Sequence, residues 1–193
     1  LEFRRVLFRS RMDKLFLCDL DTLETTTLHM FSNNSYGQSL PCIIDGVLVW
    51  AGAETTGSSD ADDKSVIYSV KLGSSRIESI HTGTYAHDPM SNGSYTAWLD
   101  SHHAPDAKLY CISPAGSEPH MVEAGVVQFG MGKDFLAYSK DEAIYLYRFD
   151  NKKSYKLSGE YEKAQFMGVS DSHVIWMDVT TRERDILKYS EVP

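Results

Sequence analysis

The chain has 193 residues, with 19 Lys and Arg against 27 Asp and Glu, and it carries a formal net charge of −8 at pH 7. An acidic protein repels phosphate backbones, which argues against nucleic acid as a partner. No apolar stretch approaches the roughly 18 residues that a membrane-spanning helix needs, which argues against membrane insertion. The three cysteines show no Cys-x-x-Cys spacing, so neither a disulfide framework nor a zinc site is expected.

The first ten residues, Leu1 to Ser10, resemble one translated reading frame of a short sequencing adapter. We therefore expect residues 1–10 to be a non-native leader and residues 11–193 to be the protein segment. Segments of this kind are set aside before a fold is argued. The arginines of the leader then carry no information about a signal or transit peptide, and any genuine signal region is missing from the sequence.

From residue 14 onward, one module recurs along the chain. It comprises a Gly-containing turn, an apolar strand with an aromatic residue, a polar loop, and a further strand with a Tyr near its start. The aromatics are Trp50, Trp98, Tyr138 and Trp176, and the matching motifs of the further strand lie at residues 66–68, 108–110, 143–145 and 185–187. A period of about 40 residues with four short strands is typical of β-propeller blades. The sequence therefore predicts an all-β propeller with near-zero helix.

Superposed on one another, the modules predict the blades in chain order. A partial blade at 14–29 holds strands 14–20 and 24–29. Three full blades follow at 39–81, 85–123 and 125–158, with strands at 40–44, 46–51, 65–72, 76–81, 87–92, 94–99, 108–113, 119–123, 126–131, 134–139, 142–149 and 154–158. A last partial blade, 164–191, holds strands 165–169, 173–178 and 185–190. Turn dipeptides such as Asp45-Gly46 and Asn92-Gly93 separate the strands and favour tight hairpins.

The recurrent aromatics could form a binding stripe, but an aromatic in the same strand of every module is better explained as core packing. The Asp that follows two of them is expected to accept hydrogen bonds from turn backbone rather than to act in catalysis. Cys18, Cys42 and Cys111 lie in strand-like runs and are expected to be small buried residues.

One module resembles the TolB-like and WD40-like propeller repeats. The resemblance rests on Pro89, Gly93, Trp98-Leu99-Asp100 and Leu109-Tyr110, and Trp176-Met177-Asp178 repeats part of the pattern, whereas Tyr138-Ser139-Lys140 replaces the Trp and loses the Asp. The resemblance covers residues 14–191. It implies a segment of a larger bacterial propeller and a periplasmic, cell-surface or secreted location, and it leaves the ligand open.

Loops between second and third strands share one end of a meander with the links between blades. The loops 54–64 and 100–107 are long and polar, and the links add aromatics, so this face is predicted to be acidic, aromatic and able to bind a protein, a peptide or a carbohydrate. The predicted ligand-binding residues are Tyr36, Tyr85, His87, Asp88, Asp100, His102, His103, Asp106 and Tyr161. The alternative is that these loops are merely solvated surface.

Asp100, His102, His103 and Asp106 lie within one loop and raise the possibility of a transition-metal site. Adjacent histidine side chains point apart, however, so we predict no metal and no other cofactor. The run Gly37-Gln38-Ser39-Leu40-Pro41 lacks the final Gly of a nucleophile elbow. No catalytic residue is therefore assigned, and we expect the segment not to be an enzyme.

Two functional hypotheses follow. The first is a non-enzymatic propeller scaffold that binds a protein, peptide or glycan through the loops of one face. The alternative is the gating propeller of a larger hydrolase, such as a prolyl-oligopeptidase-like peptidase, with a catalytic domain outside the segment. Unpaired strand edges at the first and last blades also favour self-association.

Overall fold

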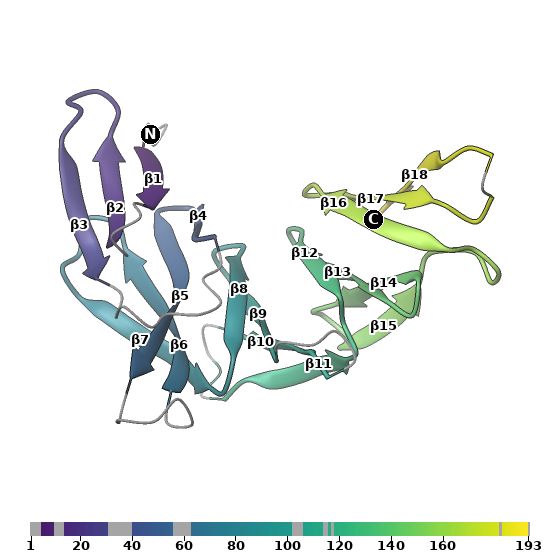
Figure 1. The fold of residues 1–193 in the computed structure, drawn as a ribbon, viewed down its shortest axis with the longest axis horizontal. Helices are drawn as coiled ribbons and strands as arrows, with labels where there is room; N and C mark the ends of the chain where they lie inside the picture. The colour runs from purple at the N-terminus through teal and green to yellow at the C-terminus, as the bar shows by residue number, and fades with distance from the viewer. Residues whose placement is uncertain are drawn as a thin grey trace. The chain divides into compact units, whose positions relative to one another are not determined.

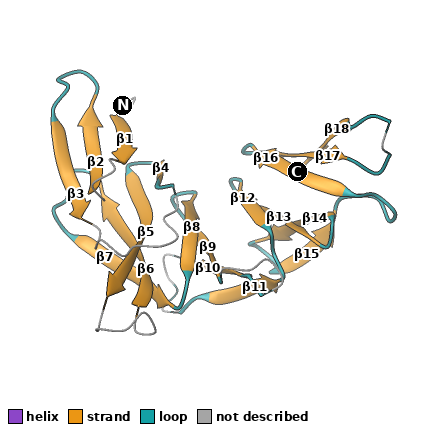
Figure 2. Cartoon of the chain, in the orientation of Figure 1, coloured by secondary structure: helices purple, strands orange, loops and turns teal. Residues whose placement is uncertain are grey.

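The computed structural model describes residues 5–9, 14–30, 40–55, 63–101, 106–113, 116, 118–181 and 183–192. Strands and turns account for this part of the chain, and none of the residues described forms a helix (Figure 2). It follows that no described helix is long and apolar enough to cross a membrane. The predicted all-β architecture is confirmed.

The strands form antiparallel sheets in which neighbours along the chain are hydrogen-bonded neighbours in space (Figure 1). The first sheet contains β1 (Arg5–Arg9), β2 (Lys14–Asp19) and β3 (Thr25–Met30). The second contains β4 (Cys42–Ile44), β5 (Val47–Thr55), β6 (Asp63–Lys71) and β7 (Ile77–Gly83). The third contains β8 (Ala86–Ser91), β9 (Thr96–Asp100), β10 (Lys108–Ile112) and β11 (His120–Ala124).

The fourth sheet contains β12 (Gln128–Met131), β13 (Phe135–Lys140), β14 (Ala143–Arg148) and β15 (Lys153–Lys156). The last contains β16 (Ala164–Val169), β17 (His173–Asp178) and β18 (Ile186–Glu191). Four consecutive strands in meander order are the pattern of a propeller blade. The sheets β4–β7, β8–β11 and β12–β15 each show that pattern.

Strand β1 lies within the run that resembles an adapter. Its five residues pair in continuous antiparallel register with β2, from Arg5 opposite Asp19 to Arg9 opposite Leu15. The sequence had assigned no strand there, so the first sheet has one strand more than expected. The foreign origin of residues 1–10 stays a prediction.

The chain divides into two compact units, Leu1–Pro89 and Met90–Pro193. The core of unit 1 lies between the first two sheets, where Leu15 of β2 clusters with Leu48 and Trp50 of β5 and with Val66 and Tyr68 of β6. Leu48 and Trp50 are at most 1% exposed. Burying such side chains stabilises a fold by about 1.5–3 kcal/mol each relative to leaving them in water.

Unit 2 has two cores that share the sheet β12–β15. On one side, Leu136 and Tyr138 of β13 cluster with Leu109 and Cys111 of β10. On the other side, Ile144 of β14 belongs to the cluster around Val174 and Trp176. The alternation of side chains along β13 and β14 thus buries both faces of this sheet.

All the recurrent aromatics are buried, Trp50 to 1%, Trp98 and Tyr138 to 0% and Trp176 to 5% exposure. Their assignment to core packing is confirmed. Trp50, Trp98 and Tyr138 lie directly opposite tyrosines of the following strand, and the rings stack with centroids 5.4, 6.1 and 5.4 Å apart. Cross-strand aromatic pairs of this kind add about 0.5–1.5 kcal/mol beyond area burial.

The last module departs from its predicted alignment by one residue. The motif at 185–187 aligned Leu187 with the tyrosines of the other modules, but the residue opposite Trp176 is Lys188, and Leu187 lies opposite Met177. In a strand, a shift of one residue transfers a side chain to the other face of the sheet. Leu187 therefore does not take the place of a stacking tyrosine, and it lies on the opposite face.

Candidate functional site

In unit 1, the link that precedes β8 lies beside the start of β6. The hydroxyl of Ser65 donates to the carbonyl of Gly83 at 3.5 Å and accepts a short hydrogen bond from the Ala86 backbone. Ser65 follows the β5–β6 loop. The link between sheets and the loop between second and third strands therefore share one end of unit 1, as the meander predicts.

The same arrangement recurs in unit 2. The Ala107 carbonyl, at the end of the β9–β10 loop, accepts hydrogen bonds from the backbone of Gly125 and Val126 in the next link. Lys163, in the β15–β16 link, donates from its ammonium group to the Glu142 carboxylate of the β13–β14 turn, and its backbone N–H donates to the Thr180 hydroxyl. We call these regions the loop end of each unit.

Tyr85, His87 and Asp88 are brought together at the loop end of unit 1. The rings of Tyr85 and His87 are 6.0 Å apart in an edge-to-face arrangement, and Nδ1 of His87 is 2.9 Å from Oδ2 of Asp88. An ionised carboxylate can only accept, so the imidazole donates in this bond and its orientation is held. The Asp88 side chain is 52% exposed and the His87 side chain 21% exposed, so the cluster borders solvent.

The backbone of this cluster is unusual. Asp88 has φ +49° although it lies within β8 and precedes Pro89. The residue before a proline ordinarily adopts an extended conformation, and a left-handed residue inside a strand is strained. Burial raises the pKa of Tyr85 above its ordinary value of about 10, so the phenol is protonated at neutral pH.

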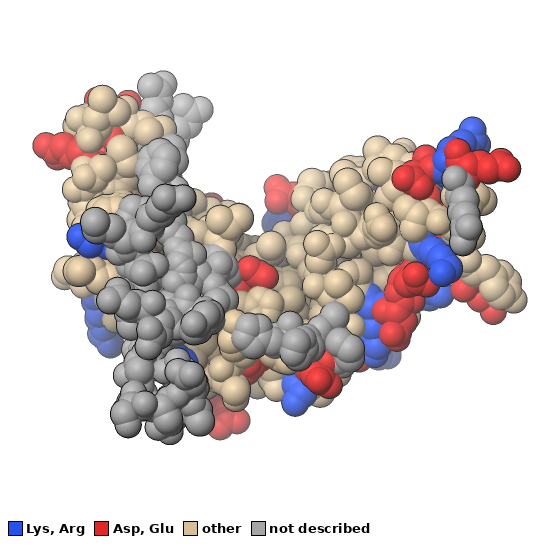
Figure 3. Space-filling model, viewed as in Figure 1, with Lys and Arg blue, Asp and Glu red and all other residues tan. Residues whose placement is uncertain are grey.

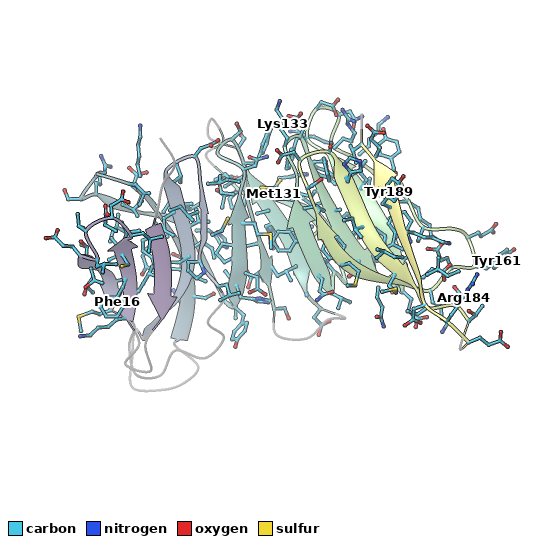
Figure 4. The ribbon with its side chains drawn as sticks, turned by 90° about the horizontal axis from the view of Figure 1, so that it is seen from above. Phe16, Met131, Lys133, Tyr161, Arg184 and Tyr189 are labelled. Atoms are coloured by element: carbon cyan, nitrogen blue, oxygen red, sulfur yellow. The ribbon has the colours of Figure 1, made fainter. Side chains whose placement is uncertain are left out.

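The other predicted residues have varied positions. Asp100 ends β9 and is half-buried, Asp106 is exposed in the turn before β10, and Tyr161 is 85% exposed in the link before β16, where Figure 4 shows it projecting beyond the strands. Tyr36, His102 and His103 lie outside the described residues. Among the described residues, no group of three His, Cys, Asp or Glu side chains is arranged to hold a metal ion.

Ion pairs that the sequence did not predict occupy the loop end of unit 2. Lys140 is 2.8 Å from Glu123, and Lys163 is 3.0 Å from Glu142. Burial is the largest single effect and acts to raise the pKa of Glu123, but the hydrogen bonds from Lys140 and the Ala124 backbone and the charge of Lys140 together lower the pKa. Figure 3 shows acidic and basic side chains interspersed in unit 2. The acidity predicted for the face is thus partly neutralised here.

A larger network joins the last sheet to the link before it. Lys188 lies 2.7 Å from Asp178 and 2.8 Å from Glu162, and Glu162 also accepts a hydrogen bond from the Trp176 indole. Hydrogen bonds from Lys188 and Thr180 lower the pKa of Asp178 to about 2. Because Asp178 accepts from the Thr180 backbone, its predicted role in holding a turn is confirmed.

A sequence signal for these pairs existed. Lys140 stands where the Trp-x-Asp pattern has Asp, and Lys188 stands opposite Trp176 where the other modules have Tyr. Each departure introduces a cation that finds a carboxylate from a neighbouring segment. The tertiary structure determines which carboxylate this is. The sequence pattern therefore indicates the two lysine positions but does not predict their ion-pair partners.

Comparison with protein-family models and with curated proteins finds no match. Solved structures do match. The chain is similar to a prolyl endopeptidase (TM-score 0.73, 13% identity, 97% of this chain and 32% of that chain) and to an oligogalacturonate lyase in complex with manganese (0.69, 13%, 97% and 59%). TolB from Acinetobacter baumannii is also similar (0.65, 12%, 97% and 50%).

The chain thus spans between about a third and three fifths of the length of these proteins. At 12–13% identity, the likeness concerns the fold alone. The neighbours include enzymes as well as TolB, and one fold hosts many functions. The chain therefore has the β-propeller fold, and its function must be argued from its own residues.

Proposed function

We propose that the chain is a non-enzymatic β-propeller scaffold that binds a protein, peptide or glycan through the loop end of its sheets. The observation that carries the proposal is the cluster of Tyr85, His87 and Asp88, with Asp88 in a left-handed conformation inside a strand. Backbone strain of this kind costs about 1–3 kcal/mol and concentrates at functional sites.

The chemistry of the cluster suits a ligand that carries amino or hydroxyl groups. The exposed carboxylate of Asp88 accepts hydrogen bonds and attracts a cation, while Tyr85 and His87 offer rigid ring surface at low entropic cost. Lysine or arginine side chains of a peptide and the hydroxyls of a sugar meet these requirements. The cluster belongs to unit 1, and the proposal needs no contribution from unit 2.

The proposal is tested by screening the purified protein against an array of oligosaccharides and of basic peptides, followed by titration calorimetry with the best binder. Asp88→Asn should weaken that binding about tenfold or more, as removal of a central interface contact does. The matched control is Asp45→Asn. Asp45 is also exposed and left-handed, with φ +47°, but it lies in the β4–β5 turn at the other end of the strands.

Asparagine tolerates the left-handed conformation, so both variants should keep the native fold. Equal affinity of Asp88→Asn and Asp45→Asn for the selected binder would contradict the proposed site. Binding that is lost in both variants would indicate a general effect of charge, and would also count against the cluster.

A second candidate is the gating propeller of a larger hydrolase. Its specific support is the likeness to the propeller-containing prolyl endopeptidase, at a TM-score of 0.73. Recovery of the complete reading frame separates the two candidates. A hydrolase domain with a serine elbow in the same frame would favour the second, whereas a frame with propeller repeats alone would favour the first.

A further inference from the structure

The burial of side chains along β8 changes phase at Asp88. Ala86 is buried, and strict alternation along the strand would place Asp88 on the same buried face. The left-handed conformation of Asp88 interrupts this alternation, and Pro89 is the next buried residue instead. The side chain of Asp88 is therefore 52% exposed. An irregularity that re-aims one side chain of a strand is typical of functional sites.

Within the described residues, the carboxylate of Asp88 pairs with no lysine or arginine. Its contact there is with Nδ1 of His87, at 2.9 Å. At the loop end of unit 2, by contrast, Glu123 and Glu142 each pair with a lysine. A neutral imidazole donates through Nδ1 without adding positive charge. The hydrogen bond from His87 thus orients the carboxylate and leaves its negative charge for a ligand.

The side chains of the cluster offer hydrogen-bond acceptors and ring surface. An ionised carboxylate only accepts, and when Nδ1 of a neutral imidazole donates, the other ring nitrogen is an acceptor. The hydroxyl of Tyr85 is buried although the residue is partly exposed, so it is not the group that a ligand meets. Ammonium and guanidinium groups donate hydrogen bonds without accepting any, whereas a sugar hydroxyl also has lone pairs that need donors. A cationic group is therefore the better complement.

The two rings of the cluster add to this preference. Tyr85 and His87 pack edge to face, with centroids 6.0 Å apart and planes inclined at 67°. The face of a tyrosine ring attracts a cation within about 6 Å of its centroid, and guanidinium groups also stack on aromatic rings. The rings adjoin the carboxylate of Asp88 through His87, so a long cationic side chain can contact both.

We propose that the cluster binds a basic peptide segment, through an arginine or lysine side chain whose charged group pairs with Asp88. This inference rests on the proposed function, because it takes the cluster as the binding site, and it selects a peptide over a glycan. The net charge of −8 on the whole chain attracts such a segment from a distance and favours its association.

The test compares two labelled probe peptides that differ chiefly in charge. One is Gly-Arg-Gly-Arg-Gly with blocked ends, and the other replaces both arginines by citrulline, an uncharged isostere. Fluorescence anisotropy measures the affinity of the full chain for each peptide. The arginine peptide should bind about tenfold more tightly or better, because its hydrogen bonds to Asp88 are charge-assisted. This comparison varies the probe, so it does not depend on the folding of a variant.

Two matched variants locate the contact. Asp88→Asn should remove most of the preference for the arginine peptide, whereas Asp45→Asn should retain it. Each substitution removes one negative charge from an exposed, left-handed aspartate. A general attraction between the peptide and an acidic protein would therefore fall equally in the two variants. Asparagine tolerates the left-handed conformation, and circular dichroism should show both variants folded.

Equal affinity for the arginine and citrulline peptides would overturn this inference, and so would a preference that survives Asp88→Asn. The same proteins are also titrated with the best binder from an array of neutral oligosaccharides. Loss of that binding in Asp88→Asn alone, without a preference for the arginine peptide, would overturn the basic peptide and leave the proposed function in place with a glycan. If binding of neither the peptides nor any oligosaccharide depends on Asp88, the proposed site fails as well.

Discussion

Single residues account for the way in which the modules differ. The Trp-x-Asp pattern places a carboxylate after the buried aromatic. In the last module this carboxylate is Asp178, which accepts a hydrogen bond from the turn backbone and pairs with Lys188. In the preceding module Lys140 takes that place and pairs with Glu123 instead. The replacement of this Asp by Lys140 thus reverses the charge at the position, and Lys140 has an ion-pair partner of its own.

Restoring the repeat pattern by Lys140→Asp should therefore destabilise the protein. The new carboxylate would face Glu123 in a pair whose side chains are only 29% and 32% exposed. We expect a loss of about 1–3 kcal/mol in the free energy of unfolding, measured by urea denaturation. Adding Glu123→Lys should recover most of it. Equal stability of Lys140→Asp and the native protein would contradict the assigned pair.

Gly130 marks a close approach between sheets of unit 2. A Cβ atom there would lie 2.9 Å from Cζ of Phe166 and 3.0 Å from a methyl group of Val169. Gly130→Ala should lower stability by about 1–3 kcal/mol through overpacking, seen as a lower thermal midpoint. Phe166→Leu in the same chain should relieve part of the cost. A midpoint unchanged by Gly130→Ala would show that the inner strands have room to shift.

At the scale of elements, the register of β18 determines which of its side chains form ion pairs and which are exposed. Because Lys188 rather than Leu187 lies opposite Trp176, the cation reaches Asp178 and Glu162. The opposite face of the same strand keeps Leu187 and Tyr189 at the surface. One register thus produces both the ion-pair network and the exposure of Leu187 and Tyr189.

The ion pairs of Lys188 with Asp178 and Glu162 make the stability of the fold depend on pH. The pKa of Asp178 is lowered to about 2 by Lys188 and Thr180. Burial is the largest single effect on Glu162 and acts to raise its pKa, but the hydrogen bonds from Lys188, the Trp176 indole and the Gly159 backbone together lower it. A lowered carboxyl pKa stabilises the fold above the ordinary value of about 4, and this contribution is lost as pH falls toward 2.

Thermal midpoints measured between neutral pH and pH 2 should therefore fall more for the native protein than for Asp178→Asn. The Asp178→Asn variant should have a lower thermal midpoint at neutral pH, and the midpoint should fall less on acidification because the carboxyl group is absent. Parallel curves for the two proteins would contradict the role of Asp178. The pKa of Lys188 is raised by the same carboxylates, so its contribution is retained until the pH exceeds the ordinary lysine value.

At the scale of the whole molecule, each unit has cores of its own. Leu48 lies in the core of unit 1 and Leu136 in a core of unit 2, and both are fully buried. In repeat architectures, stability is a sum of terms from each repeat and its neighbours. The effect of a core substitution should therefore be concentrated in its own unit.

Leu48→Ala should cost about 2–5 kcal/mol and should reduce hydrogen-exchange protection across β4–β7 more than across β12–β15. Leu136→Ala is the reciprocal variant and should show the opposite pattern. Uniform loss of protection over both units in either variant would mean that the chain unfolds as one cooperative body.

The sequence by itself determined the all-β architecture, the positions of most strands and the burial of the recurrent aromatics. These features follow from local alternation, turn dipeptides and a repeated aromatic, which neighbouring residues encode. Prediction of the candidate site was more limited: the sequence selected Tyr85, His87 and Asp88 by their residue types and their place in a link between blades, and it could not foresee the left-handed Asp88.

The tertiary structure alone decided the partners of Lys140 and Lys188, the register that separates Leu187 from Lys188, and the exposure of Leu187 and Tyr189. Each of these depends on which distant segment lies opposite a given side chain. A strand carries the same local signal whether its outer face is covered by another sheet or is open to solvent. Burial and pairing between sheets are therefore properties of the folded molecule.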